Sequence, residues 1–142
     1  MRLCSIASGS SGNCIYVGSE ATHLLVDVGI SGKRTESGLK ELGLTGRDID
    51  GILVTHEHAD HISGLGVLVR KYEIPVYATA GTIDAMKKCG SLGTIDEDLF
   101  HQVWEDKKLI IKDLTVNPMH ISHDAAQPVG YRISYGNRRV AV

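Results

Sequence analysis

The densest chemistry in the sequence lies in residues 55–61, which read Thr-His-Glu-His-Ala-Asp-His directly after an apolar run. In an extended chain, side chains two positions apart share one face. We therefore expect His56, His58 and Asp60 to point to one side, and Glu57 to point away. Imidazole and carboxylate groups that converge are typical ligands of zinc and other first-row divalent ions. The spacing predicts a metal site and disfavours a solvated polar loop.

Two neighbouring observations narrow this prediction. His61 lies at the start of a predicted helix, where a turn brings its ring back toward the same point, and Asp60 is a candidate N-cap of that helix. The zincin pattern His-Glu-x-x-His is excluded, because its second histidine would fall at position 60, which is aspartate. Glu57 is therefore not expected to act as a general base of that type.

Three other segments carry candidate groups. Asp27 ends an apolar strand, where a carboxylate either orients a ligand imidazole through its second nitrogen or serves a simple turn. Residues 8–13 read Ser-Gly-Ser-Ser-Gly-Asn and lack the lysine of a P-loop. They form either a flexible turn or a backbone nest for a substrate phosphate, with Ser10 and Asn13 as candidate contacts. His123 lies in a Ser-His-Asp triplet, but consecutive residues cannot form a catalytic triad.

The elements that must position these groups follow from the apolar periodicity. Strands are predicted at residues 2–7, 14–17, 23–28, 51–55 and 75–78, and again at 109–111, 114–117, 129–134 and 138–142. Helices are predicted at 31–42, 62–72 and 79–90. The acidic run 97–106 is expected to form a solvated face. This order indicates an α+β or α/β domain in which helices pack on a largely antiparallel sheet.

Composition restricts the class of protein. The chain has 142 residues, of which 42% are hydrophobic and 23% charged, as is typical of one globular domain. Its net charge is −2 and its basic residues are scattered, which excludes a protein that holds nucleic acid mainly by a basic field. The net charge does not exclude a protein that binds phosphates through metal ions. No apolar run approaches the ~20 residues of a membrane span, and three cysteines without Cys-x-x-Cys spacing indicate idle thiols in a reducing cytoplasm.

The motif His-Glu-His-Ala-Asp-His after an apolar strand resembles the His-x-His-x-Asp-His signature of the metallo-β-lactamase fold superfamily. The Ser-Gly-Ser-Ser-Gly-Asn run, the strand Leu-Leu-Val-Asp-Val-Gly and the stretch Ser-His-Asp-Ala-Ala-Gln-Pro-Val-Gly-Tyr agree in order. Together they look like the YycJ/WalJ-type branch, cytoplasmic bacterial enzymes regarded as metal-dependent nucleases related to RNase J and tRNase Z. The resemblance covers residues 1–142. It implies an α+β fold, the metallo-β-lactamase-like αβ/βα sandwich, of which this chain looks like the amino-terminal half.

The resemblance also implies roles for the candidate residues. His56, His58 and His123 match the three ligands of a first metal ion, and Asp60 and His61 match two ligands of a second. The family's bridging aspartate and final histidine have no counterpart in this sequence, since they would lie beyond residues 138–142. We therefore expect one or two divalent ions, zinc or manganese.

The activity implied is that of a metal-dependent phosphodiesterase, favoured as an exonuclease on DNA or RNA. It would act through metal-bound hydroxide, with Asp60 helping to orient the water. Two alternatives stay open: hydrolysis of a small thioester, lactone or lactam, and a catalytically incomplete metal-binding fragment. No residue is an evident general acid for the leaving group.

A further expectation concerns the carboxyl end, where the domain 1–142 looks truncated. In the resembled fold, two halves pack sheet against sheet. A chain that ends at Val142 is then expected to leave its inner sheet face uncovered at residues 24–28, 52–54 and 129–133. Its last strand, 138–142, would also be an unpaired edge. Self-association or marginal stability would result, because large exposed apolar patches are rare on soluble monomers.

Overall fold

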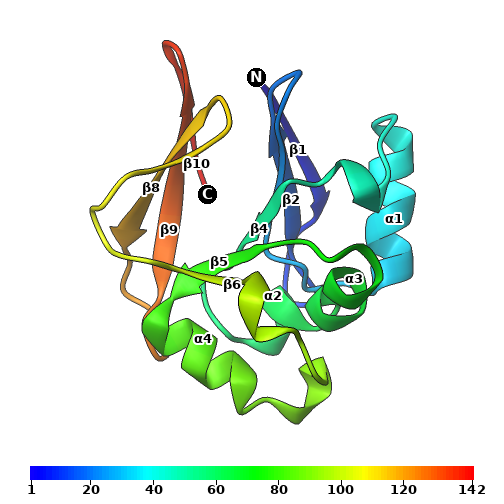
Figure 1. Ribbon diagram of the computed structural model, residues 1–142, viewed down its shortest axis with the longest axis vertical. Helices are drawn as coiled ribbons and strands as arrows, with labels where there is room; N and C mark the ends of the chain where they lie inside the picture. Colours follow the sequence, from blue (N-terminus) through cyan, green and yellow to red (C-terminus); the bar gives the residue numbers. More distant parts are fainter.

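Two β-sheets pack face to face in the computed structural model, which describes residues 1–142 (Figure 1). The six-stranded sheet contains, in spatial order, β1 (Arg2–Ala7), β2 (Cys14–Gly18), β3 (His23–Val26), β4 (Gly51–Leu53), β5 (Val76–Thr79) and β6 (Phe100–Val103). The four-stranded sheet has the order β10 (Arg138–Ala141), β9 (Val129–Tyr135), β8 (Leu114–His120) and β7 (Leu109–Ile111). The helices are α1 (Gly32–Glu41), α2 (Ala59–Ile62), α3 (Leu65–Tyr72) and α4 (Ala80–Lys87).

The six-stranded sheet is mixed, which corrects the expectation of a largely antiparallel one. Strands β1 to β3 form an antiparallel meander, whereas β3, β4, β5 and β6 run parallel to one another. Each parallel step needs a crossover, and the segments that carry α1, α3 and α4 supply them. The four-stranded sheet is antiparallel throughout.

The acidic run 97–106 is largely exposed, as predicted, but it also contains the strand β6, which was not predicted from the sequence. His101 and Gln102 in the middle of β6 are exposed, while Val103 is buried. The strand pairs with β5 on one side only, at the edge of its sheet. Two polar residues in a short edge strand hide the apolar alternation by which strands are recognised.

Two hydrophobic cores hold the layers together. One lies between the helices and the six-stranded sheet, where Leu39, Leu68 and Met86 are fully buried. The other lies between the two sheets. There Leu24 and Leu53 of the six-stranded sheet and Val116 and Ile133 of the four-stranded sheet are fully buried in one cluster. The expectation of an uncovered inner face is therefore wrong: the chain supplies both layers itself. Only the free edge of β10 remains of that expectation.

The helix predicted at 62–72 is split into α2 and α3, and Gly64 lies at the break. A Cβ at Gly64 would lie 1.8 Å from the Ile30 carbonyl oxygen, and one at Gly29 would lie 1.7 Å from the Asp60 oxygen. Only glycine permits such close approach of two backbones. The segment after β3 is thereby pressed against α2. None of the helices has the length and apolar character needed to cross a membrane.

Candidate metal centre

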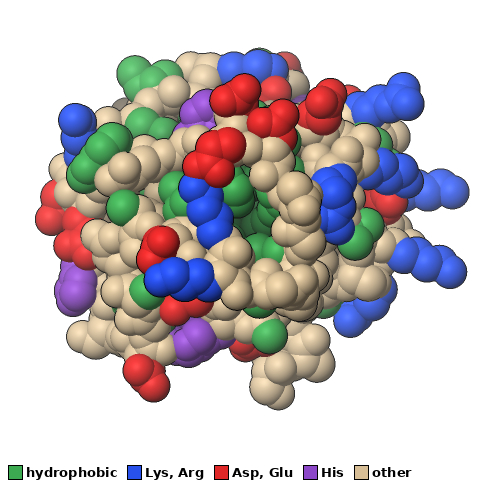
Figure 2. All heavy atoms as spheres, turned by 60° about the horizontal axis from the view of Figure 1, so that its bottom comes forward, with side chains coloured by type: hydrophobic (Ala, Val, Ile, Leu, Met, Phe, Trp, Pro, Cys, Tyr) green, Lys and Arg blue, Asp and Glu red, His purple; other side chains and the backbone are tan.

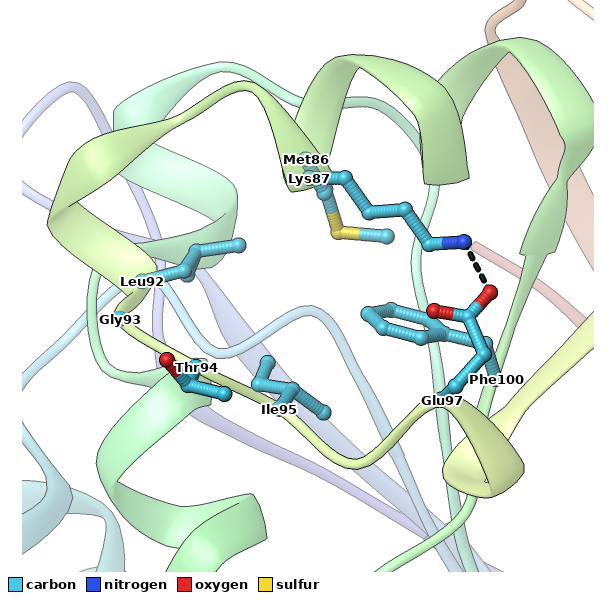
Figure 3. A pocket seen from close by; sticks show the side chains of 8 residues that line it. All are labelled: Met86, Lys87, Leu92, Gly93, Thr94, Ile95, Glu97 and Phe100. Carbon is cyan, nitrogen blue, oxygen red and sulfur yellow. Dashed lines mark hydrogen bonds and ion pairs between the residues drawn. The ribbon is translucent and has the colours of Figure 1, made fainter.

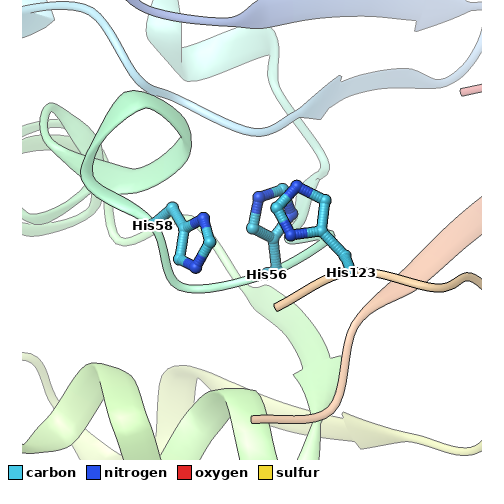
Figure 4. Close-up of side chains that lie close together, drawn as sticks. All are labelled: His56, His58 and His123. Atoms are coloured by element: carbon cyan, nitrogen blue, oxygen red, sulfur yellow. The ribbon is translucent and has the colours of Figure 1, made fainter. Parts of the chain in front are cut away.

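Three imidazoles from two distant parts of the chain meet at one point (Figure 4). His56 follows β4, His58 is the extended residue that caps α2, and His123 lies in the irregular segment between β8 and β9. Each offers a ring nitrogen, and these nitrogen atoms all lie within 4.8 Å of one another. The predicted convergence is confirmed. The three differ in exposure, since His56 is buried, His58 is partly buried and His123 is exposed.

A hydrogen-bond chain fixes which nitrogen of His56 faces the site. The Thr55 hydroxyl lies 2.7 Å from Asp27 Oδ2 and 2.9 Å from His56 Nδ1. The single hydrogen of the Thr55 hydroxyl goes to the carboxylate, which can only accept. The hydroxyl oxygen therefore accepts a hydrogen bond from His56 Nδ1. His56 therefore carries its proton on Nδ1. Its Nε2 lone pair is left free and buried without a partner.

Asp27 anchors this chain. Its Oδ1 accepts from the Thr55 backbone N–H at 2.8 Å, and its Oδ2 also accepts from His61 Nδ1 at 2.7 Å. The residue has a left-handed φ of 62°, a conformation that aspartate tolerates better than most residues. Burial raises the pKa of Asp27, while hydrogen bonds from His61 and Thr55 pull it back. Asp27 thus orients His61 directly and His56 through Thr55, as predicted for a carboxylate at this strand end.

The electrostatics favour neutral histidine at the centre of the site. Burial, and then the neighbouring His61, His123 and His58 rings, lower the pKa of His56 to about 4. At His61, burial also acts to lower the pKa, but the hydrogen bond and charge of Asp27 outweigh it and the pKa rises. A metal ion binds the neutral ring, and protons compete with it. His56 is therefore held in the form that a metal requires.

The residues predicted for a second ion lie beside this cluster. The His61 ring centroid is 4.0 Å from that of His56, and His61 Nε2 lies 3.6 Å from Asp60 Oδ2. The prediction that Asp60 is the N-cap of the helix is wrong. The helix begins earlier, so His58 takes the cap position and Asp60 lies in the first turn. The alternation therefore holds from His56 to His58 and stops before Asp60.

The 8–13 segment reaches the site through its last residue. Asn13 Nδ2 lies 3.4 Å from both Asp60 Oδ2 and His61 Nε2, and it donates to the Asp60 carbonyl oxygen at 3.2 Å. The Asn13 side chain also exchanges two hydrogen bonds with the Gly9 backbone, which closes the segment on itself. Ser10 is exposed within that closed segment. Its contact with a substrate stays a prediction.

Two participants were not predicted. Thr55 joins Asp27 to His56 through its hydroxyl, and no local sequence pattern predicts the contact with Asp27. The one signal in the sequence is that Thr55 lies between the strand and the histidine motif. Glu57 is not among the converging ligand groups, and its Oε2 accepts the Ala126 backbone N–H at 2.9 Å. It therefore contacts the segment that carries His123.

The donor set fits a divalent ion. Zinc sites with three protein ligands commonly use histidine nitrogens, and here three such nitrogens converge. A buried polar atom without a partner is rare in native proteins, and His56 Nε2 is such an atom at the meeting point. A cation that accepts its lone pair removes that deficit.

A separate hollow lies between the end of α4 and residues 92–100, where the surface opens onto apolar side chains (Figure 2). Its volume is about 220 Å³, and Met86, Leu92, Ile95 and Phe100 line it, with Lys87 paired to Glu97 at its rim (Figure 3). None of the predicted site residues lines this hollow. It gathers no group of metal ligands, so we place the chemistry at the histidines.

Comparison with known proteins agrees with this geometry. The sequence model of the metallo-beta-lactamase superfamily matches residues 7–142. The chain is 47% identical over 138 residues to the exodeoxyribonuclease YycJ of Bacillus anthracis, covering 96% of this chain and 51% of that protein. It is 43% identical over 127 residues to the exodeoxyribonuclease WalJ of Streptococcus pneumoniae serotype 2, covering 89% and 47%. The chain thus spans about half the length of the curated relatives it matches.

Solved structures give the same fold. A B3 metallo-β-lactamase with an active-site glutamic acid superposes with a TM-score of 0.79 at 18% identity, over 99% of this chain and 57% of that one. The Rm3 metallo-β-lactamase gives a TM-score of 0.78 at 16% identity, over 98% and 56%. At such identities the likeness concerns the fold alone.

Proposed function

Because this chain belongs to the metallo-beta-lactamase superfamily, we propose that it forms the metal-binding part of a hydrolase that cleaves phosphodiester bonds in nucleic acid, as an exonuclease. One observation carries the proposal: His56 presents a buried, unpartnered Nε2 to the rings of His58 and His123. The relatives named exodeoxyribonuclease favour DNA as the substrate. The three free thiols agree with a cytoplasmic setting, which is part of the proposal.

The residues divide into two groups toward the metal. We assign His56, His58 and His123 to one divalent ion, zinc or manganese, and Asp60 with His61 to part of the coordination of a second. Such an ion, when bound, lowers the pKa of a coordinated water to about 7 and neutralises charge on a phosphate. The chain itself supplies two carboxylate or imidazole ligands for the second ion, fewer than a complete site uses.

The chain's own residues would serve the reaction by position. Asp60 keeps its side chain 35% exposed beside His61, so its carboxylate can accept a hydrogen from a water and hold that water toward the site. Asn13 directs its amide at the same place, where it can donate to a phosphate oxygen. Thr55 keeps the His56 proton on Nδ1, and Asp27 keeps the His61 proton on Nδ1, so the Nε2 atom of each ring is left free for the metal. A general acid for the leaving group is not assigned.

Metal content and turnover together test this proposal. Metal analysis by mass spectrometry of the purified chain is expected to find at least one ion, and His58→Ala should weaken zinc binding by at least about a hundredfold. Glu57→Ala should weaken it far less, because Glu57 is not one of the groups that converge on the metal position. Equal losses would contradict the ligand assignment.

Hydrolysis separates the complete enzyme from a fragment. Two ions with cleavage of a phosphodiester reporter would support an enzyme in this chain alone. One ion without cleavage would support a metal-binding part that needs further residues, and the half coverage of the relatives makes that outcome worth testing directly. No metal at either site would reject the function.

A further inference from the structure

The segment that carries His123 is the weakly organised half of the histidine cluster. Residues 121–128 form no helix or strand, and His123 is exposed. Hydrogen bonds tie the segment to the rest of the molecule at its far end. The Gln127 carbonyl accepts from Thr79 Oγ1 at 2.8 Å, and Gln127 Oε1 accepts from the Gly81 N–H at 2.9 Å. These bonds fix the segment to the start of α4, not to the site.

Within residues 121–128 one hydrogen bond ties the segment to the site, and Val129, directly after the segment, donates its N–H to the Thr55 carbonyl at 3.0 Å. The Ala126 backbone N–H donates to Glu57 Oε2 at 2.9 Å, and Glu57 lies between the two histidines that follow β4. Three consecutive residues therefore supply two of the rings and a hydrogen bond, or tether, to the segment that carries the third. Ala126 lies three residues after His123, so the hydrogen bond to Glu57 restrains the segment close to that ring.

Glu57 also carries an unexplained cost. Its other oxygen, Oε1, is buried and has no hydrogen-bond partner. Burying a carboxylate oxygen without a partner is unfavourable, and buried polar atoms in native proteins are nearly always satisfied. A smaller or apolar side chain at position 57 would avoid this cost. The hydrogen bond from Ala126 is the one hydrogen bond that the Glu57 side chain makes in return.

We propose that Glu57 is a positioning residue, which holds the His123 segment by its backbone so that His123 stands beside His56 and His58 before a metal ion binds. The inference rests on the proposed role of His123 as a ligand. A side chain that pre-orients a ligand affects affinity without touching the metal, in the way that residues behind metal ligands do. It also reduces the conformational entropy that a flexible segment loses on binding.

Zinc titration against a competing chelator tests the proposal. Glu57→Ala should weaken binding about tenfold, and Glu57→Gln, which keeps an acceptor oxygen, should stay within about threefold of the parent. In a His123→Ala background, Glu57→Ala should cause no further loss, because the tether acts only through His123. Glu105→Ala is the matched control: it removes a partly exposed carboxylate that pairs with His120, outside the cluster.

Hydrogen exchange gives a readout without metal. In the metal-free chain, the Ala126 amide should exchange about tenfold faster in Glu57→Ala and near the parent rate in Glu57→Gln. The unfolding midpoint should not fall, because the buried Oε1 is removed with the tether. An equal loss of affinity in the His123→Ala background would overturn the proposal, as would unchanged affinity in Glu57→Ala. If His123→Ala itself leaves zinc affinity unchanged, the ligand assignment under the proposed function fails instead.

Discussion

The two sheets contribute to the histidine cluster in different ways. The six-stranded sheet is covered on both faces, by helices and by the other sheet, and its strand ends carry Asp27 and Thr55 in a buried hydrogen-bond network. The four-stranded sheet is covered on one face only, with Ile110 of its outer face 74% exposed. It delivers a single imidazole, that of His123, on an exposed segment. One half of the site is built into the core, and the other is attached to it.

This difference separates stability from affinity. Side chains of the buried half have lost water on folding, so their removal leaves unpaired polar groups and lowers the free energy of unfolding. Side chains of the attached half stay largely solvated, so their removal affects what binds rather than what folds. A variant of the buried half that leaves stability unchanged, or a variant of the attached half that lowers it, would contradict this division.

The largest effect on stability is expected from Asp27→Asn in the metal-free chain. Asparagine accepts the left-handed φ of 62° as well as aspartate does, so the backbone is not the cause of any loss. Its amide cannot accept from His61 and Thr55 while it also satisfies the Thr55 N–H. We expect the free energy of unfolding to fall by about 3–5 kcal/mol in denaturant titration.

His123→Ala is the counterpart of that variant on the attached half. Its side chain is exposed, so the free energy of unfolding should change by less than about 0.5 kcal/mol. If His123→Ala destabilises the metal-free chain as much as Asp27→Asn does, the distinction between the two halves is wrong.

The next effect concerns acid and comes from His56. Its pKa is lowered to about 4 in the folded chain, against about 6.5 in an unfolded one. A depressed pKa means that the unfolded state takes up the proton first. The stabilising contribution is complete above pH 6.5 and is lost as the pH falls toward 4, by about 3 kcal/mol at pH 4.

Comparing the metal-free parent with His56→Gln isolates this contribution. His61, whose pKa is raised, acts in the opposite sense, and its ring also lowers the pKa of His56, so the difference reports the contribution of His56 together with its coupling to His61. The difference in unfolding free energy between the two should therefore narrow on acidification from pH 7 to pH 4. A difference that stays constant over this range would show that the His56 ring is not desolvated.

A smaller effect is expected from Thr55→Val, which keeps the shape and removes the hydroxyl. Asp27 loses one donor and His56 Nδ1 loses its acceptor, so the unfolding free energy should fall by about 2 kcal/mol. Thr55→Ser restores the hydroxyl and should recover most of this loss. NMR of the imidazole nitrogens should show the His56 proton on Nδ1 in the parent and in Thr55→Ser, and a mixture in Thr55→Val. A single tautomer in all three would exclude the relay through Thr55.

How far the sequence predicts these features also differs between regions. The segment from His56 to His61 could be located because strand alternation and motif spacing are local properties of the chain. The parallel order of β3 to β6 could not, since it depends on which strands become neighbours after the crossovers fold. The contacts of Thr55 with Asp27 and of Glu57 with Ala126 join segments far apart in sequence, so no local period contains them.

The prediction of an uncovered sheet face was wrong for a related reason. Leu24, Val129 and Ile133 lie in the ranges that were expected to be uncovered, but all three are fully buried. The sequence pattern says which face of a strand is apolar, but not that two sheets of the same chain face each other. The strand at residues 138–142 does lie at an edge of its sheet, as predicted, but that prediction came from the family resemblance and not from the pattern of the strand.

The smallest effect expected is association through that edge. The N–H and C=O groups of Val142 exchange hydrogen bonds with Tyr131, so by antiparallel alternation the N–H groups of Ala141 and Arg139 point away from β9. Such an edge can pair with a second copy. It is only four residues long and carries two exposed arginines, which oppose pairing with another copy. It therefore buries far less than the ~800 Å² per partner of a stable interface.

We therefore expect a monomer at micromolar concentrations, and weak self-association only near the solubility limit, as measured by light scattering over a concentration series. Ala141→Pro removes one outward N–H without removing a bond to β9, so it should abolish that association and leave the unfolding midpoint nearly unchanged. Association that persists in Ala141→Pro must use another surface, and the outer face around Ile110 is then the surface to mutate. A strong dimer at micromolar concentration would show that the four-stranded sheet is not self-sufficient, and that its uncovered outer face governs the behaviour of the chain.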